Sequence, residues 1–400
     1  MYLPFFEISL IEAALILFVP LILEFPRVIV KCTILLYEKI AKKESRLPVE
    51  SLPKVSIVVP AHNEGAIIDR TIESLVTLAF SDKEILVVDD NSSDDTYLKA
   101  KPYAIRGDII LVRKRERYSN KAMALIYGVK FVSGDIIVCI DADTILQNES
   151  LIRIVEPFGN PEIVAVAGNI RVYNTQSLLE KVQAYEYLLA MEMGRAFQSL
   201  IQSLLIIPGA FGAFRRKTME SIGGFDTDTI TEDFDLTIKL RKTGFQVAFA
   251  QDAIAWTVVP NRLSDWARQR IRWAYGQLQS IMKHKDMLVN VNFGLNSVLS
   301  MVDMLYMDVF MLFVRMFWLL SLPLFFPAIP LWKVASLTLS FYLLMELIQA
   351  MVALIISPRG KRELGCLVLI PIVILFYRPL HSFVRLFAYL KAMLGLKAAW

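Results

Sequence analysis

The chain has 400 residues, of which 55% are hydrophobic, and its formal net charge at pH 7 is only +4. This composition is too apolar for an ordinary soluble protein of this length, and the small charge excludes the basic footprint of a nucleic-acid-binding protein. The three cysteines lie far apart, which excludes a disulfide framework and a zinc site of the usual spacing and favours a reducing compartment.

Residues 2–23 are mostly apolar and long enough to cross a membrane once. A cleaved signal peptide is the alternative, but the stretch has neither a basic start nor a small-x-small cleavage site. Basic residues follow between 27 and 46, so the positive-inside rule predicts that the next part of the chain is cytoplasmic. Residues 25–40 suit an interfacial helix. We therefore predict a membrane helix and a basic interfacial segment in residues 1–50.

The middle of the chain, residues 51–290, reads as an α/β domain. Short apolar runs predict strands and helical periodicity predicts the helices between them, with strands at 55–59, 84–88, 108–112 and 136–140 and helices at 64–79, 93–103 and 121–132. Pro60 is expected to close the first strand. Because strands and helices alternate at intervals of about 30 residues, we expect a parallel sheet with crossover helices.

Short segments that contain polar residues follow three of these strands at the point where each strand ends. They are Pro60, Ala61, Asn63 and Glu64 after the first strand, Asp89 and Asp90 after the second, and Asp141 and Asp143 after the fourth. Open α/β sheets bind ligands at this edge. Asp141 and Asp143 are two residues apart, so their side chains can point the same way. Paired carboxylates suit Mg²⁺ or Mn²⁺, whereas an isolated Asp-x-Asp is more often a solvated turn.

The second half of the middle region is expected to carry helices around a loop of small residues. Residues 176–205 have helical periodicity and suit a helix that lies on a membrane surface or packs under the domain. Residues 208–214 read as a loop or strand in which Gly209 allows a close approach to the backbone. We expect Thr231 to cap one helix, and Ser264 or Asp265 to cap another over residues 264–283.

The C-terminal part, residues 291–400, is apolar again. Its hydropathy predicts about three membrane spans, at 298–326, 332–356 and 364–388. The basic loop over 357–362 is expected to be cytoplasmic. The last segment is interrupted at 377–379, and it can span the membrane, re-enter it or lie flat.

Three charged residues interrupt the first of these spans: Asp303, Asp308 and Arg315. Charges are costly in lipid. Two interpretations stay open, because these side chains can line a polar path for a polymer, or residues 298–310 can lie at the interface with the span beginning later.

The order of the motifs is more specific than any one of them. An Asp-Asp follows the second strand and an Asp-x-Asp the fourth, and they are followed by Thr-Glu-Asp at 231–233 and Gln-x-x-Arg-Trp at 269–273. Over about residues 52–283 this series resembles the processive family 2 glycosyltransferases, which include cellulose synthase, hyaluronan synthase and bacterial poly-N-acetylglucosamine synthase. The resemblance implies a GT-A-like, Rossmann-type nucleotide-sugar-binding domain with interfacial helices, flanked by transmembrane helices.

The resemblance also implies roles on the donor side. Asp143 would bind the metal, with Asp141 supporting it or binding ribose. Asp89 and Asp90 would hold the nucleoside, chiefly uracil, in a pocket that the segment from Pro60 to Glu64 also lines, although a turn is the alternative for the two acids. Lys121 would reach the nucleotide or its phosphates. The family stretch around this lysine usually reads Gly-Lys-Ala, and here Asn120 replaces the glycine.

On the acceptor side, the resemblance implies that Asp233 is the general base, with Glu232 as the alternative assignment. An acid favoured by the helix dipole is the other explanation for Asp233. Gln269, Arg272 and Trp273 share one helix face. Arg272 would bind the diphosphate and Trp273 the acceptor sugar, whereas Arg268 and Arg270 fit an amphipathic helix at the membrane surface.

Two enzyme functions remain after this comparison. The first is a multi-pass cell-membrane polysaccharide synthase with a cytoplasmic catalytic domain, which takes UDP-N-acetylglucosamine or UDP-glucose, elongates a glycan and is coupled to its translocation. The second transfers one sugar to a polyprenyl phosphate or other lipid acceptor, which the small number of spans favours. The small number of spans is an objection to the first function, because few helices enclose only a narrow path, and a homodimer would supply more helices. A transporter is disfavoured because paired membrane repeats are not evident, and an inactive binding module because Asp141, Asp143, Asp233 and Arg272 are present.

Overall fold

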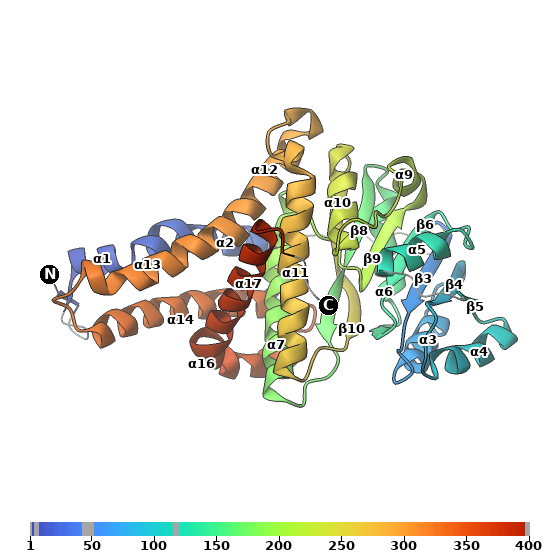
Figure 1. Ribbon diagram of the computed structural model, residues 1–400, viewed down its shortest axis with the longest axis horizontal. Coiled ribbons are helices and arrows are strands. Elements are labelled where there is room, and N and C mark those ends of the chain that lie inside the picture. The colour runs from blue at the N-terminus through green and yellow to red at the C-terminus, as the bar shows by residue number, and fades with distance from the viewer. Residues whose placement is uncertain (1, 4–7, 42–51, 115–119, 397–400) are drawn as a thin grey trace.

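The computed structural model describes residues 2–3, 8–41, 52–114 and 120–396. It has a lobe built on a β-sheet, an elongated bundle of apolar helices, and a layer of helices between them that includes α7 and α11 (Figure 1). The predicted α/β domain flanked by apolar helices is therefore confirmed.

The main sheet has eight strands in the order β5-β4-β3-β6-β9-β8-β10-β7. The strands are β3 (Val55–Ala61), β4 (Lys83–Asp89), β5 (Ile110–Arg113), β6 (Ile136–Ile140), β7 (Thr144–Leu146), β8 (Ile163–Val172), β9 (Phe211–Arg215) and β10 (Gln246–Thr257). The four strands β5, β4, β3 and β6 are parallel, as predicted. Pro60 does not close its strand, because β3 continues beside β4 until Ala61 lies opposite Asp89.

The other half of the sheet was only partly foreseen. The small-residue stretch at 208–214 contains β9, which is antiparallel to both β6 and β8. β8 and β10 are long and pair in parallel, and the short β7 pairs with the end of β10. No strand was predicted for β7, β8 or β10, although the apolar run in β8 has the composition of a buried strand.

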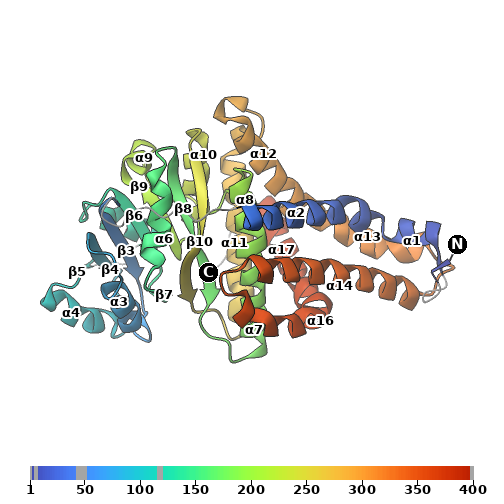
Figure 2. The same ribbon diagram turned by 180° about the vertical axis from the view of Figure 1, so that it is seen from behind.

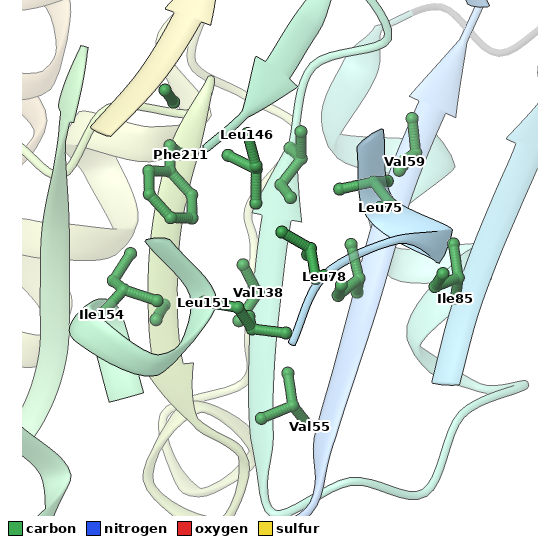
Figure 3. Close-up of a cluster of buried hydrophobic side chains, with 14 of the residues drawn as sticks. Val55, Val59, Leu75, Leu78, Ile85, Val138, Leu146, Leu151, Ile154 and Phe211 are labelled. Atoms are coloured by element: carbon green, nitrogen blue, oxygen red, sulfur yellow. The ribbon is translucent and has the colours of Figure 1, made fainter. Parts of the chain in front are cut away.

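Helices cover both faces of this sheet. α3 (Ile68–Val76), α4 (Thr96–Arg106) and α6 (Ser150–Val155) contribute to one core, and α5 (Lys121–Val129), α9 (Arg216–Ser221) and α10 (Glu232–Lys242) to the other. Figure 3 shows part of the first core, where Val59, Leu75 and Ile85 lie close together. Val58 points to the opposite core, as the alternation of a strand requires.

The interfacial layer is formed by α7 (Leu178–Leu188), the π-helical segment η4 (Leu189–Arg195), α8 (Ala196–Leu200) and α11 (Leu263–Lys283). The helix predicted over 176–205 therefore ends at Leu200. Leu188 and Phe197 share a core with Val28 and Val352, so this layer packs against the apolar helices (Figure 2).

One predicted helix cap, Thr231, lies at the N-cap position, and the other, Ser264 or Asp265, is wrong. α10 begins at Glu232 after Thr231, but the Thr231 hydroxyl makes no capping hydrogen bond and lies 3.4 Å from Ser280 Oγ. α11 begins at Leu263, which leaves Ser264 and Asp265 inside its first turn. The Thr231 hydroxyl therefore contacts a residue of α11 and does not cap its own helix.

The described residues of the stretch predicted as a single N-terminal span, 2–23, do not form one straight helix, although a bent pair of helices in this region is long and apolar enough to be one broken span. This region holds β1 (Tyr2–Leu3), β2 (Ile8–Ser9) and α1 (Leu10–Ile16), and the next helix, Val19–Ala41, is bent by 70° relative to α1. Pro20 stands in the first turn of that second helix, a position where the missing N–H costs no helical hydrogen bond. Its main part is α2 (Phe25–Ala41), which corresponds to the predicted interfacial helix.

Among the described residues, three C-terminal helical stretches are long and apolar enough to cross a membrane, or four with the bent N-terminal pair. They are Leu295–Phe325, which comprises α12 (Leu295–Met304), η7 (Leu305–Phe310) and α13 (Met311–Phe325); α14 (Leu331–Ile356); and Gly360–Met393, which comprises α15 (Gly360–Glu363), η8 (Leu364–Leu369), α16 (Ile370–Ile372), η9 (Val373–Tyr377) and α17 (Arg378–Met393). α17 lies along α11 rather than along α14 (Figures 1 and 2).

The charges within the first stretch have partners on other helices. Asp303 forms an ion pair with Arg27, and Arg315 Nε lies 2.8 Å from Glu24 Oε1. Gln277 Nε2 donates to Asp308 Oδ2 at 2.9 Å. Two of these contacts join the N-terminal helix to the C-terminal bundle, which lowers the cost of placing charges among apolar helices.

We expect Leu75→Ala to destabilise the sheet lobe by about 3 kcal/mol, because Leu75 is fully buried and its truncation leaves a cavity. The matched control is Leu98→Ala on α4, where the leucine is 67% exposed. Thermal unfolding in detergent checks this, with an expected fall of roughly 6–12 °C for the first variant only. Equal midpoints for the two variants would contradict the assignment of this core.

Candidate active site

The loops after β3 and β4 are joined by hydrogen bonds at the carboxyl edge of the sheet. The Asn63 N–H donates to Ser92 Oγ at 3.0 Å, and the Ser93 N–H donates to Asn63 Oδ1 at 2.8 Å. Asn63 has a φ of 57°, which places it in the left-handed region that asparagine tolerates better than most residues. The predicted residue Asn63 therefore shapes this edge through its side chain.

The two acids after β4 differ in their surroundings. Asp89 is fully buried, and its Oδ2 lies 2.9 Å from Nε of Arg113 at the end of β5. Arg113 also stacks on Tyr97, with 4.7 Å between the guanidinium carbon and the ring centroid. Asp90 is also buried, and its N–H donates to the Ala61 carbonyl at 2.8 Å. These contacts tie Ala61, Asp89 and Asp90 together.

Lys121 is the centre of the site. It is the first residue of α5, and the Asn120 side chain caps this helix by accepting a hydrogen bond from the Met123 N–H at 3.1 Å. The asparagine therefore serves as a helix N-cap. Lys121 Nζ forms an ion pair with Asp141, lies 3.6 Å from Glu232 Oε1 and donates to the Gly209 carbonyl at 3.2 Å.

Gly209 holds the two sides of the site together. Its N–H donates to Asp233 Oδ2 at 2.9 Å, while the Phe234 N–H donates to Asp233 Oδ1 at 2.8 Å. A Cβ at Gly209 would lie 2.8 Å from Lys121 Nζ, so a larger residue would displace the lysine. The close approach that glycine permits at this position is that of the Lys121 side chain to the Gly209 backbone.

The carboxylates facing Lys121 carry more negative charge than it compensates. Burial and the nearby charge of Asp141 raise the pKa of Asp143 to about 6. Burial, followed by the charges of Asp143 and Asp141, raises the pKa of Glu64 to about 7. Burial would lower the pKa of Lys121, but Asp141 and Glu232 outweigh it and hold the pKa above its usual value.

This cluster has the donor set of a divalent-metal site. Asp143 Oδ1 also accepts a hydrogen bond from Thr257 Oγ1 at 3.3 Å, which fixes the carboxylate at the end of β6. A cation bound to Asp141 and Asp143 would relieve the repulsion that raises the pKa of Asp143. Oxygen ligands of this kind suit Mg²⁺ or Mn²⁺.

A second group of acids is already bridged by lysines, because Lys239 also pairs with Asp226. Asp226, Asp228 and Asp235 lie close enough to share a cation. Lys283 Nζ donates to all three, at 2.6, 2.7 and 3.2 Å respectively. The ammonium group takes the place of a metal, so we assign this cluster to the packing of α11 on α10.

The Gln-x-x-Arg-Trp helix separates into two faces. Arg272 and Trp273 are exposed, and Gln269 is half-buried and accepts a hydrogen bond from Arg270 at 3.0 Å. The interpretation of Arg270 as a membrane-surface residue is wrong, since it is only 1% exposed. It shares its buried face with Trp266, because the two residues are four apart along the helix.

Arg270 belongs to a buried cluster that the sequence analysis did not foresee. Its guanidinium donates to Glu186 Oε2 at 2.5 Å, and Tyr377 Oη donates to the same oxygen at 2.6 Å. Tyr187, on α7 beside Glu186, is half-buried, and the loss of water around its phenol raises its pKa to about 12. Thr257 was missed as well, and no sequence signal marks it.

Residues 136–388 match the family model described as glycosyl transferase family group 2. The poly-beta-1,6-N-acetyl-D-glucosamine synthase of Staphylococcus aureus strain COL is 32% identical over 242 residues, which are 60% of this chain and 58% of that protein. The enzyme of the same name from Staphylococcus epidermidis is 31% identical over 230 residues, or 57% of this chain and 56% of its own length. The chain thus spans less than two thirds of these relatives.

One solved structure has the same fold over most of the chain. It is a mannosyltransferase from Pyrobaculum calidifontis in complex with GDP-Man and Mn²⁺, with a TM-score of 0.64 and 20% sequence identity. The match covers 96% of this chain and 100% of the other. The likeness establishes the GT-A-like architecture, including the helices outside the sheet lobe.

We expect Glu64→Gln to flatten the pH dependence of stability of the metal-free protein. The pKa of Glu64 rises from 4.5 to about 7 on folding, so its favourable contribution is complete below pH 4.5 and is lost as the pH rises through 7. Thermal midpoints measured with a chelator between pH 5 and 8 check this. The exposed control Glu162→Gln should keep the wild-type slope, and an unchanged slope in Glu64→Gln would contradict the buried site.

Proposed function

Because the chain belongs to glycosyl transferase family group 2, we propose that it is a membrane-embedded inverting enzyme that elongates a polysaccharide from a UDP-sugar with the help of a divalent metal. The observation that carries this proposal is the convergence of Asp141, Glu232 and the Gly209 loop on Lys121. UDP-N-acetylglucosamine is the donor we expect first, and UDP-glucose is the second choice.

The donor side of the reaction is assigned to the strand ends. We assign Asp143 and Asp141 as ligands of Mg²⁺ or Mn²⁺, and a bound ion would neutralise the charge that develops on the departing diphosphate. Lys121 would add a second cation beside that diphosphate. We assign Asp89 and Asp90 to the nucleoside, together with Pro60, Ala61, Asn63 and Glu64. The ion pair with Arg113 would hold the Asp89 carboxylate in a fixed orientation.

The acceptor side is assigned to α10 and α11. Asp233 is our general base, because two backbone N–H groups hold its carboxylate in one orientation. Glu232 is the alternative base, because burial raises its pKa toward the operating range of such a group. The exposed face that carries Arg272 and Trp273 would bind the diphosphate and the acceptor sugar, with Gln269 beside them.

We place the sheet lobe in the cytoplasm of a multi-pass membrane protein. The basic loop that follows α14 supports this orientation through the positive-inside rule. In this arrangement residues 1–50 and 291–400 contact the bilayer, and residues 51–290 carry the reaction. The contact of α17 with α11 supports a position for the last helix along the membrane surface. A homodimer would enlarge the path for a growing glycan.

The length of the product tests the proposal directly. Purified protein in lipid is incubated with Mg²⁺ or Mn²⁺ and a panel of labelled UDP- and GDP-sugars, and the products are resolved by size. A ladder or high-mass smear from one UDP-sugar supports the synthase and identifies its donor. A single product that partitions into organic solvent would replace it with transfer of one sugar to a lipid acceptor.

We expect Asp143→Ala to weaken Mn²⁺ binding on the order of 100-fold and to abolish transfer, because a carboxylate ligand is lost. Mn²⁺ binding is followed by electron paramagnetic resonance and transfer by labelled sugar. Asp228→Ala, in the cluster that Lys283 neutralises, is the control and should retain metal binding. Wild-type turnover in Asp143→Ala would remove this residue from the metal site.

We expect Asp233→Asn to keep UDP binding, measured by calorimetry, while transfer slows by roughly 10²–10⁴-fold because the base is lost. Glu232→Gln is the comparison, since both variants preserve side-chain size and remove one charge. If Glu232→Gln shows the larger loss and Asp233→Asn keeps a near-normal rate, the base assignment passes to Glu232.

A further inference from the structure

A cavity of about 1130 Å³ lies where α14 ends and the chain returns toward α15. One wall comes from the sheet lobe and includes Arg153 on α6 and Asp252 on β10. The opposite wall comes from the end of α14 and from the loop that follows it, residues 357–362. The cavity therefore joins the catalytic lobe to the part of the chain that we place at the membrane surface.

The loop wall carries cations whose charge is not balanced by a neighbouring acid. Lys361 and Arg362 are exposed and have no side-chain partner among the described residues. Arg359 stacks on Trp256, 4.7 Å from the ring centroid, and its Nε has no hydrogen-bond partner within the described chain. These three side chains offer donors and positive charge to an anionic group.

The acids of the cavity are on the other wall, where Glu149 and Glu156 share the single cation Arg153, and among the described residues no ion pair joins these acids to Arg359, Lys361 or Arg362. Arg153 lies 2.7 Å from Glu149 and 3.1 Å from Glu156. Asp252 is the remaining acid of the lining and is exposed. The positive charge of the loop is therefore available to a ligand.

Apolar side chains of the cavity continue from the loop onto the helix bundle. Met351 and Ile355 on α14 are 42% and 54% exposed, and Leu364 at the start of η8 is 52% exposed. A ligand that only carried a phosphate would leave these surfaces in water. A ligand with a phosphate and hydrocarbon chains would cover both kinds of surface.

The cavity is separate from the reaction centre. Neither Asp141 nor Asp143 lines the cavity, and Ile254, the lining residue nearest to Thr257 on β10, lies three residues before it, which corresponds to roughly 10 Å. The two sites are connected through β10, since Trp256 under Arg359 is the neighbour of Thr257.

We propose that this cavity binds the headgroup phosphate of an anionic phospholipid through Arg359, Lys361 and Arg362, with its acyl chains along Met351 and Ile355. The inference rests on the membrane location proposed above. It does not depend on the identity of the donor or on catalysis.

Native mass spectrometry of the full chain in detergent tests this with phosphatidylglycerol and phosphatidylcholine of the same acyl chains. The wild type should hold one phosphatidylglycerol at least tenfold more tightly than phosphatidylcholine. Arg359→Gln/Arg362→Gln should lose at least tenfold in that affinity, and Lys361→Gln, which removes one exposed charge, should lose a smaller part. Lys101→Gln/Lys217→Gln removes two exposed charges elsewhere and should bind like the wild type.

Competition identifies the source of the phosphate. Glycerol 3-phosphate and inorganic phosphate should not displace phosphatidylglycerol at equal concentration, and displacement by either would overturn the lipid assignment. Equal retention of both lipids, or no loss in the folded Lys361→Gln variant, would overturn the site itself. Neither result bears on sugar transfer, which is measured separately, and failure of the wild type to associate with any bilayer would instead refute the proposed location.

Discussion

The geometry of the site depends on one electrostatic constraint, the meeting of several carboxylates around the ammonium group of Lys121. The lysine contacts Asp141 and Glu232 directly and reaches Asp233 through the Gly209 backbone. This arrangement joins β6, α5 and α10, which are distant in the sequence. Burial, together with the charges of the neighbouring carboxylates, raises the pKa values of Glu64 and Asp143, so the metal-free site binds protons more readily than free carboxylates do.

A second set of buried charges attaches the sheet lobe to the helices that we place in the membrane. Arg171 on β8 pairs with Glu192 on η4 and lies 3.1 Å from Glu363 in α15. Arg270, Glu186 and Tyr377 form a similar connection between α11, α7 and η9. Removing one partner of such a buried pair typically costs about 3–5 kcal/mol. These contacts fix the position of the lobe relative to the helices.

The parallel half of the sheet and the residues at its edge were predictable because each depends on a local pattern. The runs at β3, β4 and β6 are buried on both faces, so they read as short apolar segments, and polar residues mark the end of each. The strand β8 was overlooked although its apolar run is typical of a buried strand, whereas Gln251 and Asp252 interrupt the apolar run of β10. Arg270 was misassigned because an arginine beside tryptophan resembles a membrane-surface residue, although its four-residue spacing from Trp266 already placed it on the buried face.

The sequence by itself determined the class of fold, the apolar C-terminal helices and the chemical types of the residues at the strand ends, because periodicity and residue type are local properties. Only the tertiary structure decided which of those residues meet. Lys121 faces Asp141 and Glu232, Thr257 reaches Asp143, and Asp303 pairs with Arg27. Such contacts depend on the packing of segments far apart in the chain. Interactions between these charged groups are weak in water and become strong enough to select one partner over another only when folding buries them.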